Sequence, residues 1–479
     1  MTFGILHLNT IPSKKRLDKI QYFLKIVFMK IPERPPTFET ILKYFKDNKL
    51  DFTKLFSIQS KDAKYISYED TKYRPIPEDL KEFGDNRIIW WAWIVLSRIH
   101  KFRELPLRAS EDGVYFKFFL DNLDLQLIHK FDLNAGGTLS VSGVIPNEQQ
   151  RNKYFISSLI EEAFSSSFME GAISTRERAK KLIAESREPK DKNERMILNN
   201  YLTMQELENW KNEELSPELI CKIHTKISEG TLPPDKLGKF RSKEDKDIVL
   251  GDDFGNTYHT PCDYESIPSR IKELCDFANT EFTGANFIHP IIKAIILHFM
   301  LAYIHPFCDG NGRTSRALFY WYLLKNNYWI VKFISISKII LETGNRYYMS
   351  FLNTEQDYND LNYFIKFQLE VFDRAIKAFY EYISNKQKEL IDYSSIYPKL
   401  KELNSREKNI ALRIIKKPFE SLEITIESHA GLNGVSWETS RKDLHNLENQ
   451  KILTKRKDGK IFIYTPSQQF LDQIESRYQ

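Results

Sequence analysis

Between residues 148 and 389, apolar and polar positions alternate with an almost continuous helical period. The period breaks at "EPKDKN" (188–193) and at "EGTLPPDKLG" (229–238), where proline, glycine and charged residues cluster. One interruption, "DIVLGDDFGNTYHTP", instead alternates apolar residues around a Gly/Asp turn, which is typical of a short β-hairpin. This part of the chain predicts an all-α domain with one hairpin flap.

The segment before this domain has a different pattern of apolar and polar residues. Residues 31–146 carry proline-rich turns around one strongly apolar stretch, "RIIWWAWIVLSRIHKF". Its tryptophans, Trp90, Trp91 and Trp93, would cover most of a helix surface, which favours a buried core helix over an aromatic binding platform. Met29 begins "MKIPERPPTF", which reads as a translation start, so residues 1–28 are interpreted as an upstream extension.

The sequence pattern changes again after about residue 391, where shorter elements are predicted. A helix at "REKNIALRIIKK" is followed by a strand or short helix at "EITIESHAGL". A further helix follows with Ser436 as its N-cap, and then a hairpin that turns at Asp458 and Gly459. This order indicates a winged-helix domain. The predicted fold is therefore mainly α, divided into an N-terminal extension (1–30), an N-terminal accessory domain (31–146), the helical domain (147–390) and the winged-helix-like domain (391–479).

Composition and charge exclude several classes of protein. The chain has 479 residues, 42% hydrophobic and 28% charged, which is typical of folded soluble proteins. The net charge of +5 is too small to indicate nucleic acid or membrane binding by itself. The apolar stretch near residues 20–31 is broken by Lys25 and Lys30 and is shorter than the roughly 18 residues that a membrane span needs. No membrane association is therefore expected.

The spacing of the cysteines indicates in which cellular compartment the protein is expected. They show no CxxC spacing, which favours reduced thiols in a cytoplasmic protein over disulfides or structural zinc. They are Cys221, Cys262, Cys275 and Cys308.

Candidate chemistry is concentrated in "IHPFCDGNGRTSRALFYWYL" (304–323). The preceding helix starts with Pro290 in the favoured first position and is apolar nearly all round, so it should be buried. Pro306 disfavours helical geometry at His305 and ends the helix there. The histidine is therefore expected at a rigid helix exit.

The residues of this segment suit a polyphosphate site. His305 can accept a proton near neutral pH, and Asp309 offers the hard oxygen donors that Mg²⁺ prefers. The glycines of 310–312 open the next helix, where backbone amides and the helix dipole attract anions. Arg313 and Arg316 lie three apart and can each bind phosphate oxygens through two donors. Together they predict nucleotide-dependent group transfer.

The stretch "HPFCDGNGRTSR" is identified as matching in full the HPFx[D/E]GNGRxxR signature of the Fic domain family, best known as protein AMP-transferases. The resemblance implies a helical domain in which His305 deprotonates a Ser, Thr or Tyr hydroxyl of a protein and Asp309 holds Mg²⁺. It also implies that ATP is the substrate and that a phosphate cradle binds it, formed by Gly310, Asn311, Gly312 and Arg313, with Arg316 reaching the γ-phosphate.

The same resemblance narrows the reaction. Gly312 argues against the kinase-like Doc branch, in which a lysine stands at that position. Transfer of another group, UMP or phosphocholine, is an open alternative. Self-modification is expected, and a homodimer is left open.

An inhibitory element is implied upstream. Ser166, Glu170 and Gly171 resemble the [S/T]xxxE[G/N] motif of relatives whose regulatory helix, here near residues 156–172, precedes the core. The resemblance implies that Glu170 pairs with Arg316 and blocks the site of the γ-phosphate. In some relatives the same glutamate positions a water that removes AMP, so reversal of the modification is a second implied role.

Other contacts are predicted outside the motif. The flap residues Val249, Leu250 and Gly251 are candidates for docking a target segment by strand addition, with an ordinary surface hairpin as the alternative. Tyr347 and Tyr348 resemble the paired tyrosines that lie beside adenine and ribose in the family.

The C-terminal domain leaves its partner open. Arg441 and Lys442 should lie on the exposed side of its recognition helix, with Leu444 and Leu447 in the core, and the wing tip "KRKDGK" is basic. Such a surface could bind DNA or dock a protein. The alternative to an enzyme is therefore a DNA-binding regulator with a nucleotide-sensing Fic core.

Overall fold

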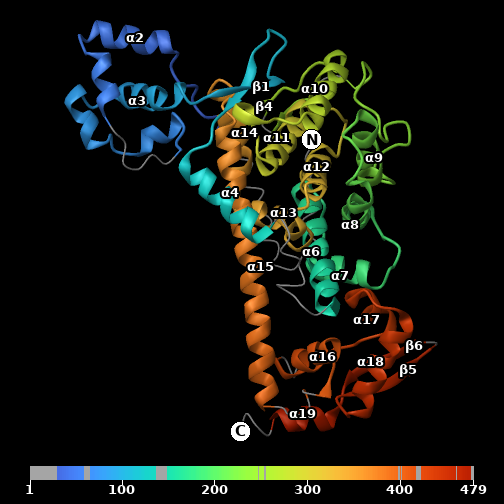
Figure 1. Ribbon diagram of the computed structural model, residues 1–479. Helices are drawn as coiled ribbons and strands as arrows, with labels where there is room; N and C mark the ends of the chain where they lie inside the picture. The colour runs from blue at the N-terminus through green and yellow to red at the C-terminus, as the bar shows by residue number, and fades with distance from the viewer. Residues whose placement is uncertain are drawn as a thin grey trace.

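A computed structural model describes residues 30–58, 65–135, 148–245, 248–252, 255–396, 400, 402–416, 422–459 and 461–475. All but Lys30 of the predicted extension at residues 1–30 lies outside these ranges. Within them, buried apolar side chains form three separate cores, one in an N-terminal lobe, one in a central domain and one in a C-terminal domain. The three parts follow one another in the chain and are distinct in Figure 1.

The N-terminal lobe is built around one apolar helix. Its tryptophans Trp90, Trp91 and Trp93 are all buried, at 6%, 1% and 8% exposure, which confirms the predicted core helix. Trp93 donates a hydrogen bond to the carbonyl of Ile58, so its polar edge is satisfied as well. The elements of the lobe are α2 (Phe38–Asp47), η2 (Phe52–Ser57), η3 (Glu69–Tyr73), η4 (Glu78–Phe83) and α3 (Arg87–Ile99).

A β-hairpin and a helix follow this lobe but pack on the central domain. Leu105, Phe116 and Phe131 belong to the central core, whereas the core of the N-terminal lobe ends at Leu96. The chain therefore passes from the core of the N-terminal lobe to the core of the central domain between residues 96 and 105. The boundary between these two domains that was predicted from the sequence lies at residue 146. The elements are β1 (Arg103–Arg108), β2 (Tyr115–Phe118) and α4 (Asn122–Ala135), with β1 and β2 antiparallel.

The central domain is mainly helical and surrounds a pair of buried helices, α11 and α12. Nearly every residue of α11 is buried because the helix is apolar on all sides, as predicted. The helices of the domain are α6 (Glu148–Met169), α7 (Arg176–Ala184), α8 (Lys192–Trp210), α9 (Pro217–Ser228), α10 (Ile267–Asn279), α11 (Pro290–Ile304), α12 (Asn311–Lys325), α13 (Ile336–Glu342), α14 (Arg346–Gln356) and α15 (Asn362–Ile396). Short 3₁₀ turns are η5 (Tyr264–Ser266), η6 (Gly284–Asn286) and η7 (Trp329–Phe333).

The predicted flap is confirmed as a short antiparallel hairpin of β3 (Leu250–Gly251) and β4 (Thr257–His259). Leu250 pairs with His259 and Gly251 with Thr257. The carbonyl of Asn256 lies so close to Gly251 that no Cβ would fit there, which explains a glycine inside the strand.

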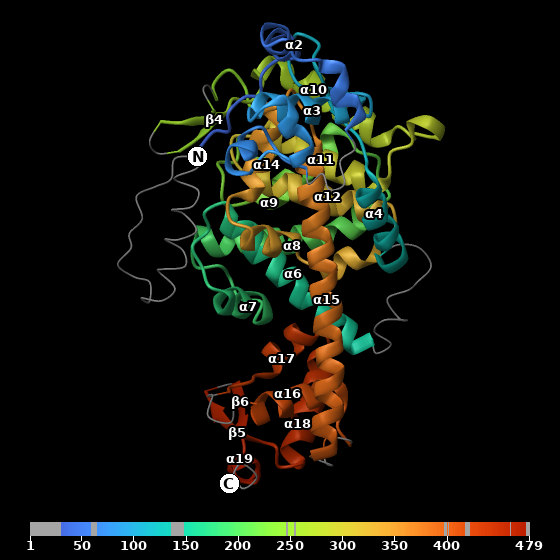
Figure 2. The same ribbon diagram turned by 90° about the vertical axis from the view of Figure 1, so that its left-hand side faces the viewer.

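Helix α15 connects the central domain to the C-terminal domain. It has 35 residues, a length of about 50 Å at 1.5 Å per residue. Figure 2 shows it running from the central helices down to the C-terminal domain. None of the helices in the described ranges combines the length and the apolar run that a membrane span requires.

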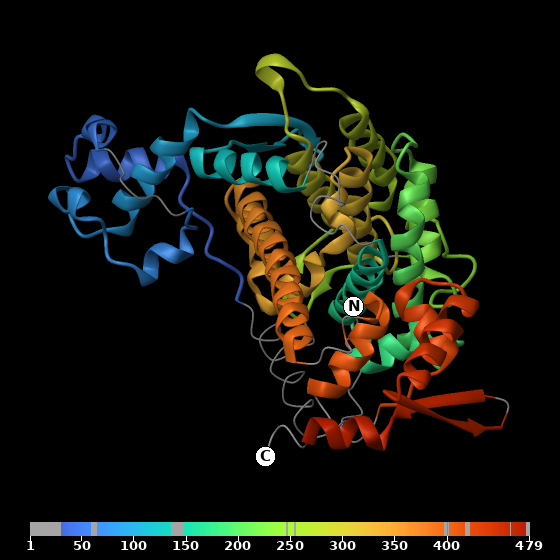
Figure 3. The same ribbon diagram turned by 60° about the horizontal axis from the view of Figure 1, so that its bottom comes forward.

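The C-terminal domain has the helices and the hairpin in the predicted order. Its elements are α16 (Ser405–Lys416), α17 (Ile426–Asn433), α18 (Trp437–Asn449), β5 (Leu453–Asp458), β6 (Ile461–Pro466) and α19 (Gln468–Glu475). The "EITIESHAGL" segment forms a helix rather than a strand, because Thr425 and Ser428 make a capping box at its start. The hairpin, red in Figure 3, extends away from the helices.

Helix α18 presents the faces that the sequence predicts. Ser436 caps it by accepting a hydrogen bond from the amide of Thr439. Leu444 and Leu447 are fully buried, and Arg441 and Lys442 are exposed. The assignment of the whole domain as a winged helix stays a prediction.

Candidate active site

His305 lies at the end of α11 with its backbone in the left-handed region, at φ 51° and ψ 56°. Such a conformation costs a non-glycine residue about 1–2 kcal/mol, so the surroundings must enforce it. The ring Nδ1 lies 3.2 Å from the carbonyl oxygen of Ala302, which can only accept a hydrogen bond. Nδ1 therefore carries the proton of the neutral ring, and Nε2 is left as the basic atom.

The protonation state of His305 is set by its burial. The side chain is buried, with 8% exposure for the residue, and burial lowers its pKa to about 3 despite the hydrogen bond to Ala302. The ring is therefore neutral near pH 7. Its Nε2 has no hydrogen-bond partner among the residues that the structure describes.

Arg241 holds the turn after α11 in place. Its amide donates to the carbonyl of Pro306 at 2.7 Å, and its Nε donates to the carbonyl of His305 at 2.7 Å. Its Nη2 donates to the carbonyl of Cys262, close to the end of β4. This buried guanidinium therefore ties the backbone of His305 to the base of the flap. Sequence reasoning missed Arg241, because 64 residues separate it from the histidine.

His224 holds the next part of the loop and was also missed. Its ring stacks on Phe307 with centroids 3.7 Å apart and planes 3° apart. Its Nε2 donates to the carbonyl of Asp309 at 2.9 Å, and its Nδ1 accepts from the amide of Gly238. Burial lowers its pKa to about 4, which preserves this tautomer near pH 7. A histidine on the apolar face of α9 was the only local signal.

Two motif residues close the loop around this histidine. Gly310 has φ +86°, and a Cβ there would lie 2.9 Å from Ser228 Oγ, so only glycine fits. Asn311 uses its whole side-chain amide on the backbone of Phe307, accepting at 2.9 Å and donating at 2.7 Å. Asn311 can therefore contribute to a phosphate cradle only through its backbone.

Asp309 has a partly accessible side chain, at 36% exposure. Its Oδ1 accepts a hydrogen bond from the amide of Gly310 at 2.6 Å and lies 3.7 Å from Arg313 Nη2. Its Oδ2 has no hydrogen-bond partner in the described part of the chain. One oriented carboxylate with a free oxygen fits Mg²⁺, which typically takes one or two carboxylates plus substrate phosphates.

Arg313 is a buried cation with unused donors. The residue is 1% exposed, and its Nη1 donates to the carbonyl of Ile227 at 3.3 Å. Its Nε and Nη2 are buried without hydrogen-bond partners. A buried donor left unsatisfied costs about 1–3 kcal/mol. Arg313 lies in the first turn of α12, where the first amides have no intrahelical acceptor, so this end of the helix fits an anion.

Arg316, in contrast, has its partners. Its Nε donates to Ser166 Oγ at 2.8 Å, and its Nη2 donates to the carbonyl of Ser166 and to Glu170 Oε1 at 2.8 Å. Burial alone would lower the pKa of Arg316, but the Glu170 carboxylate raises it above its ordinary value. The predicted Glu170–Arg316 pair is thus present in the structure, with side-chain exposures of 7% and 2%.

The carboxylate of Glu170 lies directly over Gly312. A Cβ added at Gly312 would overlap Glu170 Oε1 and would lie 2.9 Å from Glu170 Cδ. Helix α6 ends at Met169, so Glu170 stands in the turn that follows, with Gly171 at φ +91°. The predicted helix near 156–172 is therefore slightly shorter at this end. Glu170 Oε2 is buried without a hydrogen-bond partner.

The two predicted nucleotide tyrosines occupy different places. Tyr347 is 4% exposed, and His298 shares a 3.0 Å hydrogen bond with its hydroxyl. Tyr348 is partly buried and meets the ring of Tyr347 edge-on at 5.2 Å. The ring of Tyr347 is therefore part of the core, and only Tyr348 lies at its margin.

The flap is fastened beside the end of α11. His259 Nε2 donates to the carbonyl of Tyr303 at 2.8 Å, and its Nδ1 lies 3.0 Å from Glu355 Oε2. The flap candidate Val249 is 42% exposed, and Leu250 and Gly251 are partly exposed. The structure thus brings the flap to the turn that carries His305.

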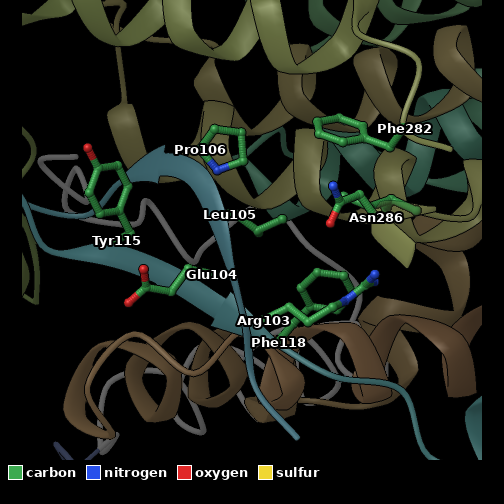
Figure 4. A pocket seen from close by; sticks show the side chains of 9 residues that line it. Arg103, Glu104, Leu105, Pro106, Tyr115, Phe118, Phe282 and Asn286 are labelled. Atoms are coloured by element: carbon green, nitrogen blue, oxygen red, sulfur yellow. The ribbon is translucent and has the colours of Figure 1, made fainter. Parts of the chain in front are cut away.

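A cavity of about 460 Å³ lies elsewhere, between hairpin β1–β2 and the loop before α11 (Figure 4). Arg103 at its edge donates hydrogen bonds to the carbonyls of Ala285 and Phe287. No residue of the predicted site lines this cavity. Its lining consists of Arg103, Glu104, Leu105, Pro106, Tyr115, Phe118, Phe282, Asn286 and Ile288.

Part of the chain that includes the site is similar to known proteins. Residues 214–323 match the Fic/DOC family. This range includes His224, Arg241, the flap and the whole motif, and it leaves Glu170 and Tyr347 outside.

Curated relatives are similar to part of the chain. A protein adenylyltransferase Fic from Nematostella vectensis is 28% identical over 170 residues, which are 35% of this chain and 35% of the relative. A protein adenylyltransferase fic-1 from Caenorhabditis elegans is 32% identical over 108 residues, 22% of this chain and 19% of the relative. The chain thus spans about a third or less of the length of these relatives.

Two solved structures are similar at low identity. A Fic family protein from Desulfovibrio desulfuricans has a TM-score of 0.45 at 16% identity and covers 73% of this chain and 97% of its own. Fic-1 from Caenorhabditis elegans has a TM-score of 0.39 at 22% identity and covers 53% of this chain and 68% of its own.

Proposed function

Because residues 214–323 form a Fic domain, we propose that this protein transfers AMP from ATP to a hydroxyl group of a protein, and that Glu170 inhibits the transfer. The single observation that carries the proposal is the place of the Glu170 carboxylate. It lies over Gly312 and against Arg316, so a negatively charged group of the chain itself occupies a site built for an anion. The relatives named protein adenylyltransferase support ATP as the source of that anion.

His305 acts as the general base. A hydroxyl oxygen of the target forms a bond to the α-phosphorus while the bond from that phosphorus to the bridging oxygen breaks, and pyrophosphate leaves. The hydroxyl proton goes to His305 Nε2, because Nδ1 is committed to Ala302. With a pKa of about 3 the buried ring is a weaker base than the sequence suggested, so the negative charge of the bound phosphates must raise this pKa for efficient proton transfer.

Arg313 and the amides at the start of α12 bind the phosphates. The unused Nε and Nη2 donors of Arg313 gain acceptors when an anion enters, which removes the unfavourable state of the ligand-free site. Asp309 would hold Mg²⁺, which when bound supplies positive charge against the phosphates. Arg241 and His224 keep the intervening loop in one conformation. The distance and orientation between His305 and the phosphate cradle are therefore fixed.

Glu170 inhibits in two ways. It occupies the donors of Arg316 that would otherwise reach the γ-phosphate, and its charge repels an incoming polyphosphate. Transfer therefore requires Glu170 to leave this place.

The target is expected to lie along the flap. Sheet β3–β4 has two strands in the described part of the chain, so each strand keeps one unpaired edge. A target segment that pairs with the edge at Val249, Leu250 and Gly251 would bring its hydroxyl to His305, because the flap is fastened to the end of the same helix. A cytoplasmic location stays a prediction from the sequence.

The test uses purified full-length protein, with Mg²⁺ and ATP labelled on either the α- or the γ-phosphate. Glu170→Gly should incorporate the α-label at least about tenfold faster than wild type, because one anion site is freed. Glu170→Gly combined with His305→Ala should show no incorporation and serves as the matched control.

Each other result has a definite meaning. Incorporation from the γ-phosphate alone would identify a kinase and overturn the proposal. Equal α-labelling of wild type and Glu170→Gly would overturn the inhibitory role of Glu170. A cell lysate can be added to supply target proteins. If neither wild type nor Glu170→Gly then incorporated the α-label, adenylyl transfer from ATP would be overturned.

A further inference from the structure

The C-terminal domain is seated on the two helices that flank Glu170. Helix α17 contacts both α6 and α7, and α16 contacts α6 as well. Figures 1 and 2 show α17 directly beneath these helices. Because α6 ends one residue before Glu170 and α7 begins six residues after it, a single helix of the C-terminal domain touches both helices that flank the inhibitory turn.

Two glycines make this contact possible. A Cβ at Gly431 would overlap the carbonyl oxygen of Ala184, the last residue of α7. A Cβ at Gly434 would lie 3.0 Å from Ile156 Cδ1 and 3.7 Å from Asn152 Cβ on α6. The Gly431 contact joins backbone to backbone, so no side chain can move aside to relieve an added group.

The contact between α17 and these helices depends on shape alone. The described residues of α17 form no hydrogen bond or ion pair with α6 or α7; His429 and Asn433, its buried polar residues, are bonded inside the C-terminal domain. The C-terminal domain also has a core of its own. Because the two bodies have separate cores, motion of one relative to the other is possible without unfolding of either.

Helix α6 can carry a displacement to the site. Ile156 and Glu170 are 14 positions apart, about 20 Å along a helix. Between them, Glu162 accepts hydrogen bonds from Tyr320 at 2.9 Å and from Ser335 at 2.8 Å, so a displacement of α6 that reaches Glu170 must shift these bonds as well. Tyr320 lies one helical turn after Arg316 on α12, so α6 and α12 are joined at both residues.

We propose that docking of α17 on α6 and α7 holds Glu170 in its inhibitory place, and that undocking of the C-terminal domain activates the enzyme. A ligand of the C-terminal domain that cannot bind while α17 is docked would then be the activator. This inference rests on the proposed function and assigns its regulation to a contact outside the residues that match the family.

The first test is Gly431→Gln in the full-length protein, measured by α-labelled ATP incorporation beside wild type and Glu170→Gly. Undocking should raise the rate about 5- to 150-fold over wild type, the usual range of coupling between two sites. Leu432→Gln is the matched control, since Leu432 neighbours Gly431 but is 37% exposed, and its rate should equal that of wild type. Adding His305→Ala to Gly431→Gln should remove the gain.

The outcomes separate this inference from the proposed function. An active Glu170→Gly beside a Gly431→Gln protein at the wild-type rate would overturn the coupling and keep the function. An inactive Glu170→Gly would overturn the function itself.

A second variant works even where Gly431→Gln does not fold. Cysteines at 152 and 434 would have Cβ atoms about 3.7 Å apart, which suits a disulfide. In Asn152→Cys/Gly434→Cys, the oxidised protein should label itself several-fold more slowly than the reduced protein, while the single variant Asn152→Cys should not respond to reductant. Equal rates in the oxidised and reduced double variant, with the disulfide verified by mass spectrometry, would contradict the coupling.

Discussion

Arg313 and Arg316 lie three residues apart on α12 and are equally buried, at 1% exposure, yet their surroundings are opposite. Arg316 has Glu170 and Ser166 as partners, and the Glu170 carboxylate raises its pKa. Arg313 keeps two donors without partners, and burial lowers its pKa. Arg316 thus has an anionic partner within the chain, whereas Arg313 has donors available for the anion of a ligand. An inhibited nucleotide site requires this combination.

The largest effect is expected from removing the satisfied arginine. Arg316→Met leaves Glu170 as a buried carboxylate without its cation and should lower the free energy of unfolding by about 3–5 kcal/mol. Urea denaturation followed by tryptophan fluorescence measures the loss. The double variant Arg316→Met/Glu170→Leu removes both charges and should recover most of it. A double variant as unstable as the single one would show that the ion pair is not the cause.

A smaller effect should follow from filling the space under Glu170. In Gly312→Ala the new Cβ overlaps Glu170 Oε1, and overpacking of this kind costs about 1–3 kcal/mol. The same substitution in a Glu170→Gly background should cost almost nothing, because the overlapping atoms are absent. Thermal unfolding of the four proteins tests the coupling, and additive losses would argue against the close approach of Glu170 to Gly312.

The less satisfied arginine should respond much more weakly. Arg313→Met removes two buried donors without hydrogen-bond partners, which offsets the loss of the Nη1 bond to Ile227 and of the 3.7 Å ion pair with Asp309, so the ligand-free protein should change in stability by no more than about 1–2 kcal/mol. The same variant should lose the thermal stabilisation that Mg²⁺-ATP confers on Glu170→Gly, when it is placed in that background. If Arg313→Met destabilised the ligand-free protein as much as Arg316→Met does, the two arginines would not differ as the structure indicates.

The smallest effect concerns pH. His298 is fully buried, and burial, followed by the charge of Arg316, lowers its pKa well below the ordinary value. The unfolded chain therefore binds the proton first as the pH falls, so stability decreases below about pH 6.5, by at most about 1.4 kcal/mol per pH unit for this histidine. His298→Phe should reduce the pH slope of the free energy of unfolding between pH 6.5 and 5. A slope identical to that of wild type would contradict the low pKa.

Much of the site was predictable because its residues are close in sequence. The spacing of His305, Asp309, Arg313 and the glycines places them in one turn between two helices. The Glu170–Arg316 pair was also predicted, through resemblance rather than geometry, and the structure contains it. Hairpin β1–β2 was not predicted, although Leu105 and Leu107, and then Phe116 and Phe118, are buried at alternate positions on either side of a turn that contains Gly113.

The sequence by itself determined the apolar helices, the flap, and the chemical groups available at the end of α11. Only the tertiary structure decided how those groups are used. The side-chain amide of Asn311 is hydrogen-bonded to the backbone of Phe307, and Tyr347 lies in the core. Arg241 donates a hydrogen bond to the backbone carbonyl of His305. The tertiary structure also decided that α17 rests on the inhibitory helices. The physical reason is that local patterns arise from bonds between near neighbours. Contacts between residues tens or hundreds of positions apart are selected by the packing of the whole chain, for which no spacing rule exists.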